Sequence, residues 1–280
     1  MKTSLFTLVM KDCQLEEVIE VVARIGYDGI EPRGSEPHLA VDTPIERVEE
    51  ICSLLDDAGL RTSCLATYTG GYTRKTDAEC QQELDNLAKF AKFARILGCD
   101  LIRHGAGGPS PRQATQEQFE RGVNWMQKAA DMAASAGCRL AIELHHGGLA
   151  ESAEDADRLL NAINRENVGV ILDPGNMYIS RADYGDKAVR LLGDRIFHVH
   201  VKDELKVGVH VDSSCFAVGD EFYQHKLLGD GAVDHIPAFR ALKEIGYTGY
   251  LSCECHGPAE DQVAVAEHEY AELKRQLSAL

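Results

Sequence analysis

The sequence repeats one pattern: a helical stretch ends at a glycine, and a short apolar strand that finishes in a polar residue follows within a few positions. At least six copies occur, among them ARIGYDGIEPR, ARILGCDLIRHG, ASAGCRLAIELHH and KEIGYTGYLSCECHG. Glycine adopts the left-handed conformation that ends a helix, and the segments that follow are rich in Ile, Val, Leu and Cys, as strands are. The repeat therefore indicates alternating helices and strands.

Two further strands complete the set, over residues 4–9 and over residues 168–172, where Asn164 stands in place of the glycine. Helices are expected over residues 14–25, 44–58, 77–97, 115–136, 152–163, 182–192, 234–244 and 260–277. Eight strands alternating with eight helices predict an α/β fold: a single (β/α)8 TIM barrel domain over residues 1–280. The longest irregular stretch, at about 204–233 after the seventh strand, is a candidate lid. A doubly wound open sheet is the alternative, but residues 9–12 hold no glycine-rich phosphate loop.

Charge and composition argue against two classes of partner. The chain has 45 Asp and Glu against 29 Lys and Arg, a formal net charge of −16. Such a surface repels nucleic acid and anionic membranes, so the expected partner is a small molecule. No apolar run is long enough for a membrane helix. Nine cysteines without a CxxC pair indicate reduced thiols and a cytoplasmic location.

Ionisable residues end the last four strands, and in a TIM barrel the active site lies at these carboxyl ends. The residues are Glu143, Asp173, His200 and Glu254. Three carboxylates crowded at one place would repel one another unless a cation lay between them. Three oxygen ligands and one imidazole suit Mn²⁺, Mg²⁺ or Co²⁺, with Zn²⁺ as a further option. We therefore expect these four residues to bind one divalent metal ion.

The segments LAIELHHGG, VGVILDPGNM, IFHVHVKDE, LLGDGAVD and YLSCECHG, in this order and spacing, resemble the sugar isomerase/epimerase superfamily with the xylose isomerase-like barrel. Ketose 3-epimerases, hydroxypyruvate isomerase and inosose dehydratase belong to it. The resemblance covers essentially the whole chain. It implies a metal-dependent enzyme of carbohydrate metabolism and a homo-oligomer, and it assigns the metal to the same four residues.

For the epimerases of that family, the resemblance makes Glu143 and Glu254 the catalytic acid/base pair. The implied reaction removes a proton from the carbon next to a carbonyl, through an enediolate that the metal stabilises. The first hypothesis is therefore a sugar isomerase or epimerase.

Two positions depart from the ketose 3-epimerases, which carry a Glu and a His where this chain has Leu149 and Asn176. The HVKD form of the seventh motif looks more like inosose dehydratase, so a lyase on the same metal site is the alternative. An apurinic-site endonuclease is a remote alternative, because the chain has Asn176 and Tyr223 where that pattern requires metal ligands. A binding protein without catalysis is the remaining hypothesis.

Several residues near the strand ends are candidates for binding substrate, each against the simpler interpretation of a structural side chain. They are Glu31, Arg33, His104, His145, Asn176, Lys202 and His256. His198 lies deeper in its strand than His200, so we expect a hydrogen-bonded core histidine. For His225 we expect solvent exposure. Gly229–Gly231 offers no clear anion site, which favours an unphosphorylated substrate.

Overall fold

The computed structural model of the protein describes residues 1–256 and 261–280, and its main feature is a parallel sheet in the order β3-β2-β1-β12-β8-β7-β6-β5-β4. The strands are β1 (Lys2–Phe6), β2 (Gly29–Glu31), β3 (Arg61–Thr62), β4 (Leu65–Gly70), β5 (Leu101–Gly105), β6 (Arg139–Glu143), β7 (Val168–Leu172), β8 (Ile196–Val201) and β12 (Tyr250–Cys253). Because β3 and β4 are two parts of one chain segment, the sheet returns to its start and forms a nearly closed barrel. The predicted TIM barrel is confirmed.

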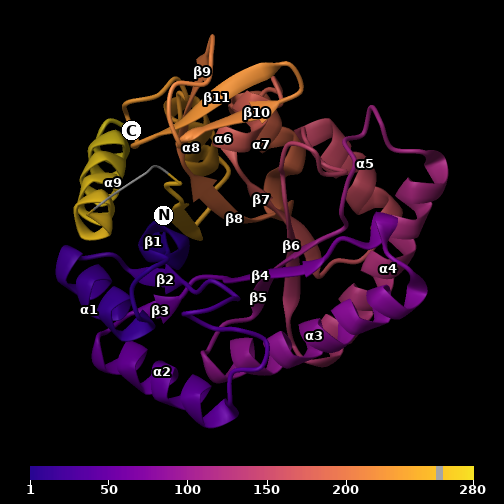
Figure 1. The fold of residues 1–280 in the computed structure, drawn as a ribbon, viewed down its shortest axis with the longest axis horizontal. Coiled ribbons are helices and arrows are strands. Elements are labelled where there is room, and N and C mark those ends of the chain that lie inside the picture. Colours follow the sequence, from indigo (N-terminus) through magenta and orange to yellow (C-terminus); the bar gives the residue numbers. More distant parts are fainter. Residues whose placement is uncertain (257–260) are drawn as a thin grey trace.

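Helices surround this barrel (Figure 1). They are α1 (Leu15–Ile25), α2 (Ile45–Asp57), α3 (Asp77–Ile96), α4 (Gln116–Ser135), α5 (Ala153–Ile163), α6 (Pro174–Ile179), α7 (Asp186–Leu192), α8 (Ile236–Glu244) and α9 (Gln262–Ser278). The two longest begin with capping boxes, Thr76 with Glu79 and Thr115 with Gln118, which satisfy the first free N–H groups. Asn164 ends α5 at φ 50° and so replaces the missing glycine of the repeat.

The core lies between the strands and the helices. In β7 all five residues are buried, as expected for a parallel strand covered on both faces. The helices contribute apolar stripes, such as Val18 and Val22 of α1. Fully burying one such side chain contributes about 1.5–3 kcal/mol, so the wall of the barrel is a rigid support for the residues at its strand ends.

Three predicted elements have other bounds than expected. The first strand ends at Phe6, and a 3-10 helix over Thr7–Met10 follows instead of strand. The third strand is interrupted between β3 and β4. The helix expected over 182–192 begins only at Asp186, and the short α6 before it was not expected. The last helix is observed over Gln262–Ser278, and its expected first residue, at position 260, lies outside the described residues.

The stretch at about 204–233 is not an irregular loop over most of its length. It contains a three-stranded antiparallel sheet, β10-β11-β9, formed by β9 (Asp203–Val207), β10 (Cys215–Val218) and β11 (Glu221–Lys226). Figure 1 shows this small sheet, in orange, beyond the end of β8. Phe216 of β10 stacks on His146 at 5.9 Å between ring centroids, which places the sheet beside the loop after β6.

No helix in the part of the chain that the structure describes is long and apolar enough to cross a membrane. Disulfide bonds are likewise absent among the described residues.

Candidate metal and active site

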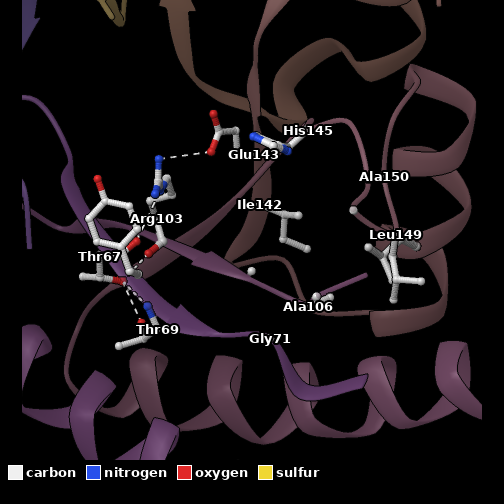
Figure 2. Close-up of a pocket in the computed structure, with 15 residues that line it drawn as sticks. Thr67, Thr69, Gly71, Arg103, Ala106, Ile142, Glu143, His145, Leu149 and Ala150 are labelled. Atoms are coloured by element: carbon white, nitrogen blue, oxygen red, sulfur yellow. Dashed lines mark hydrogen bonds and ion pairs between the residues drawn. The ribbon is translucent and has the colours of Figure 1, made fainter. Parts of the chain in front are cut away.

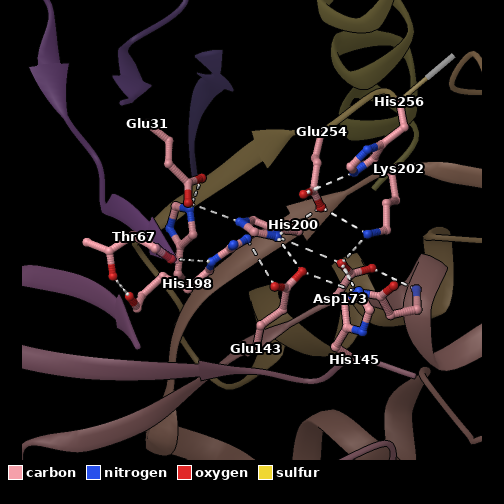
Figure 3. Close-up of polar contacts among 12 residues, drawn as sticks. Glu31, Thr67, Glu143, His145, Asp173, His198, His200, Lys202, Glu254 and His256 are labelled. Atoms are coloured by element: carbon pink, nitrogen blue, oxygen red, sulfur yellow. Dashed lines mark hydrogen bonds and ion pairs between the residues drawn. The ribbon is translucent and has the colours of Figure 1, made fainter. Parts of the chain in front are cut away.

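The four predicted metal ligands converge at one end of the barrel. Each of Glu143, Asp173, His200 and Glu254 offers a ligand atom, and these atoms all lie within 4.8 Å of one another. Figure 3 shows Glu143 and Glu254 approaching His200 from opposite sides, with Asp173 beside them. Asp173 also caps α6, because its Oδ1 accepts a hydrogen bond from the Asn176 N–H at 2.8 Å. The short helix that the sequence did not predict thus fixes one ligand.

The ring of His200 is oriented by a buried carboxylate. Its Nε2 lies 3.1 Å from Glu31 Oε1, and its Nδ1 lies 3.3 Å from Glu143 and 3.1 Å from Glu254. A hydrogen bond from Nε2–H to Glu31 leaves Nδ1 as the nitrogen that faces the cluster. This carboxylate–histidine arrangement is the usual support of a metal-binding imidazole.

His198 also bonds Glu31, through Nε2 at 2.8 Å, so both oxygens of this carboxylate have a histidine partner. The expectation of a hydrogen-bonded core histidine agrees with this placement. Burial alone would raise the pKa of Glu31, but His200 and His198 lower it well below its usual range. Glu31, His198 and His200 also have ligand atoms close enough for a metal, and we interpret them as a positioning group because their hydrogen bonds join them directly.

Two cations accompany the carboxylates. Lys202 Nζ lies 2.9 Å from Asp173 Oδ2 and 3.0 Å from Glu254 Oε2, and its side chain is buried. Arg103 binds Glu143 Oε2 at 3.1 Å. Burial would raise the pKa of Glu254, but Lys202 and His200 hold it well below its usual range. The carboxyl group of Glu254 is therefore ionised in this arrangement.

The donor set fits a divalent metal ion. Three carboxylates and one oriented imidazole nitrogen are the ligands that hard and borderline ions bind. Asn176 adds a neutral contact, because its Nδ2 donates to Asp173 Oδ2 at 2.7 Å and to Glu143 Oε1 at 3.2 Å. The residues present thus fit the predicted metal site.

A pocket of about 270 Å³ adjoins the cluster and shares Glu143 with it. Figure 2 shows this pocket between β4, β5 and the loop after β6, with Arg103 and Glu143 at one end and Leu149 and Ala150 at the other. Its other lining residues are Thr67, Tyr68, Thr69, Gly71, Gly105, Ala106, Gly107, Ile142, His145, Gly148 and Leu159. The pocket therefore opens directly onto Glu143 of the carboxylate cluster.

Five of the seven predicted substrate residues fall into three groups. His145 lines the pocket, while Lys202 and His256 bond Glu254, His256 through Nε2 at 3.2 Å. Asn176 and Glu31 form hydrogen bonds with the proposed ligands, and both side chains are buried. They are placed to support the metal site.

The assignment of His104 to substrate binding needs correction. Its side chain is fully buried, with Nδ1 2.8 Å from Thr69 Oγ1 and Nε2 2.7 Å from Tyr72 Oη. Burial lowers the pKa of His104 to about 3, and the charge of Lys75 acts in the same direction. Both ring nitrogens already have protein partners, so the ring is a structural support behind the pocket.

Sequence reasoning missed Arg103, which stands one residue before His104. The period of two along β5 was the available signal, because Leu101, Arg103 and Gly105 share one face and His104 lies on the other. The prediction instead assigns substrate binding to His104, the polar residue nearer the end of the strand. The inward arginine carries the contact to Glu143.

His225 and Glu204 form a second pair that the sequence did not indicate. His225 Nδ1 lies 2.9 Å from Glu204 Oε1, and the His225 ring stacks on Phe216 at 4.5 Å and on His256 at 4.9 Å. His225 is less exposed than expected, since 23% of its side chain is accessible to solvent. The small antiparallel sheet brings this pair next to the residues that contact Glu254.

The backbone of the Gly229–Gly231 loop is occupied by an internal carboxylate. Asp203 Oδ2 accepts hydrogen bonds from the N–H groups of Gly229 and Gly231 at 3.0 Å each, and Oδ1 accepts one from Val233 at 3.0 Å. A Cβ at Gly231 would lie 2.1 Å from Asp203 Oδ1, so only glycine allows this approach. These N–H groups are not available to a substrate phosphate.

Comparison with known proteins identifies the class. A model of the xylose isomerase-like TIM barrel family matches residues 19–276, so the chain belongs to this family. An inosose dehydratase of Clostridium botulinum is 29% identical over 285 residues, which cover 95% of this chain and 89% of that protein. An inosose dehydratase of Lacticaseibacillus casei is 26% identical over 279 residues, covering 93% and 87%. The chain is thus a member of a family of enzymes.

Solved structures share the fold. A probable 3-DHS dehydratase from Bacillus anthracis superposes with a TM-score of 0.82 at 19% identity, covering 98% of this chain and 99% of that one. The zinc-bound IOLI protein gives 0.81 at 17% identity, covering 100% and 99%. An L-ribulose 3-epimerase gives 0.79 at 21% identity, covering 99% and 95%. At these identities the likeness concerns the fold alone.

Proposed function

We propose that the protein is a divalent-metal-dependent enzyme that removes a proton from the carbon next to the carbonyl of a small polyhydroxylated ketone. The observation that carries the proposal is the convergence of Glu143, Asp173, His200 and Glu254 on one point beside a pocket. A divalent ion held there would supply positive charge for the oxygen on which negative charge develops. Mn²⁺, Mg²⁺ or Co²⁺ is favoured by the ligand set, and Zn²⁺ is a further candidate.

Glu143 and Glu254 are the proposed acid/base pair. They face the cluster from opposite sides, so one can take a proton from one face of a substrate carbon while the other serves the opposite face. Arg103 and Lys202 hold these carboxylates in place and keep them ionised. Glu254 and Lys202 are buried and Glu143 and Arg103 are only slightly exposed, which limits the access of water to the point of proton transfer.

Dehydration is the outcome that we favour. After the C–H bond breaks, its electrons form a carbon–carbon double bond, the β-hydroxyl leaves, and a donor supplies the proton that releases water. Lys202 and His256 both contact Glu254, and we propose them as candidates for this donor. The inosose dehydratases similar over nearly the whole chain support this reaction, with an inosose-like cyclic ketone as substrate.

Isomerisation or epimerisation of a sugar is the second candidate, because two glutamates on opposite faces suit proton removal and return. We rank epimerisation below dehydration because the pocket has the apolar Leu149 at the position where ketose 3-epimerases carry a glutamate. Both reactions begin with the same step.

Product analysis after incubation of the metal-reconstituted protein with an inosose tests the proposal. Dehydration predicts rising ultraviolet absorbance from an enone or diketone, whereas epimerisation predicts a new ketone without that absorbance. Glu254→Gln should abolish either product, and Glu267→Gln, on the exposed face of α9, serves as the matched control. Full activity in the Glu254 variant would refute the assigned role.

A further inference from the structure

Two arginines flank one alanine in a single row of the barrel. Ala66 of β4 pairs with Arg103 of β5, and on its other side it bridges to Arg33, just after β2. Arg103 points into the barrel, where it binds Glu143. Paired residues of a parallel sheet point to the same face, and Arg33 follows the inward Glu31 by two positions. Both guanidinium groups therefore face the interior at the mouth.

Tyr68 joins the two arginines. Its ring centroid lies 5.8 Å from the guanidinium carbon of Arg33 and 4.8 Å from that of Arg103. Tyr68 and Arg103 both line the pocket, and Tyr68 is 52% exposed. Tyr68 and Arg103 thus form one edge of the pocket, and Arg33 stands next to that edge, against the Tyr68 ring.

Among the residues that the structure describes, Arg33 has no charge partner. Its Nε is buried without a hydrogen-bond partner, and within residues 1–256 and 261–280 no ion pair to it is present. Arg103, in contrast, binds Glu143 and donates from Nε to the Thr67 carbonyl oxygen at 3.2 Å. A partly buried, unpaired guanidinium is unfavourable, and its fork of N–H groups matches a carboxylate or a phosphate.

The formal charges of the side chains at the barrel mouth leave one positive charge, that of Arg33, without a balancing negative charge. Four carboxylates, those of Glu31, Glu143, Asp173 and Glu254, would be balanced by Arg103, Lys202 and a divalent ion bound at the cluster. The charge of Arg33 then remains, in a chain whose net charge is −16. A neutral substrate would leave this charge uncompensated, whereas a substrate with one anionic group would neutralise it.

We infer that Arg33, together with Tyr68 and Arg103, forms a subsite for an anionic group of the substrate. The substrate class is then a polyhydroxylated ketone that carries a carboxylate or a phosphate. This inference rests on the proposed function, since it names the substrate of the same site. The Gly229–Gly231 loop does not compete for the role, because Asp203 occupies its N–H groups.

Isothermal titration calorimetry on the metal-loaded protein tests the subsite. The probes are quinate, a cyclic polyol carboxylate; myo-inositol, its neutral counterpart; and inorganic phosphate. We expect quinate to bind at least about tenfold more tightly than myo-inositol. Arg33→Gln should weaken quinate binding roughly 10- to 100-fold and leave myo-inositol unchanged.

Two variants complete the design. Arg33→Lys keeps the charge without the fork and should recover part of the affinity, which a folding defect would not do. Arg240→Gln, on the exposed face of α8, should bind quinate like the wild type.

Each outcome decides the proposal. Phosphate binding that depends on Arg33, without quinate binding, supports the anion subsite and assigns the group to phosphate. Equal binding of quinate and myo-inositol, or an unchanged quinate affinity in Arg33→Gln, overturns it. If the wild type still converts a neutral inosose in that case, the proposed function stands and only the subsite fails. If no ketone reacts, the proposed function itself fails.

Discussion

Two sides of the barrel mouth differ in how tightly their side chains are held. The charged side lies at the ends of β6, β7, β8 and β12, where Glu143, Asp173, His200, Lys202 and Glu254 bond one another. Four of these side chains are buried, and that of Glu143 is 12% exposed. On the pocket side, at the ends of β4 and β5 and in the loop after β6, Tyr68, His145 and Leu149 border open space.

This difference separates two tasks. Proton transfer needs groups fixed in position and shielded from water, which the charged side provides. Recognition of a particular substrate needs a wall of adjustable shape, which the pocket side provides. Changes on the charged side should therefore act on turnover, and changes on the pocket side on substrate binding.

Glu254→Gln is expected to have the largest effect. The amide cannot accept the substrate proton, so kcat should fall by about 100- to 10,000-fold while the fold remains intact. Steady-state kinetics with the reactive ketone, with the melting temperature as a check on folding, measures this. A higher KM with an unchanged kcat would contradict this role and would show that Glu254 serves to bind the substrate.

Glu31→Gln should weaken metal binding by roughly 10- to 100-fold, because Glu31 orients His200 without being one of the four ligands. Equilibrium dialysis with Mn²⁺ measures the affinity. Kinetics at saturating metal should then recover most of the activity. Unchanged Mn²⁺ affinity would show that the hydrogen bond to Nε2 does not support the site.

Tyr68→Ala tests the pocket side. Loss of the ring removes the contact with Arg33 and Arg103, and we expect KM to rise about two- to tenfold with kcat nearly unchanged. Tyr68→Phe keeps the ring face and should behave like the wild type. A loss of kcat as large as that of Glu254→Gln would contradict the separation of the two sides.

His104→Gln should change stability with pH and leave the chemistry intact. The folded-state pKa of about 3 lies below the ordinary value of 6.5, so the unfolded chain binds a proton that the folded chain does not. His104 thus contributes stability above about pH 6.5 that is lost as the pH falls toward 3, on the order of a few kcal/mol. Urea unfolding at several pH values should show a weaker acid dependence in the variant, and equal dependence in both proteins would contradict this.

The sequence predicted the charged side better than the pocket side. Glu143, Asp173, His200 and Glu254 each follow an apolar strand, so topology alone brings them to one end of a barrel. Arg103 was missed because the end of a strand cannot be placed to within one residue from sequence. A shift of one residue along β5 exchanges the inward Arg103 for the outward His104.

Long-range contacts explain the remaining differences. Asp203 binds backbone N–H groups of residues 229–233, and no local pattern indicates that partnership. The antiparallel sheet β10-β11-β9 was overlooked because its strands are polar and partly exposed. His225 consequently lies beside the site, in a position that its own neighbours in sequence do not reveal.

Proton NMR in D₂O tests the central claim most directly. Metal-reconstituted protein is incubated with an inosose, and the signal of the proton next to the carbonyl is followed with the wild type and with Glu254→Gln. We predict that the wild type exchanges this proton for deuterium, or removes it as the dehydrated product forms. In Glu254→Gln the signal of this proton should remain. Retention of the proton by the wild type, with metal bound and across neutral and anionic polyhydroxylated ketones, would contradict the account.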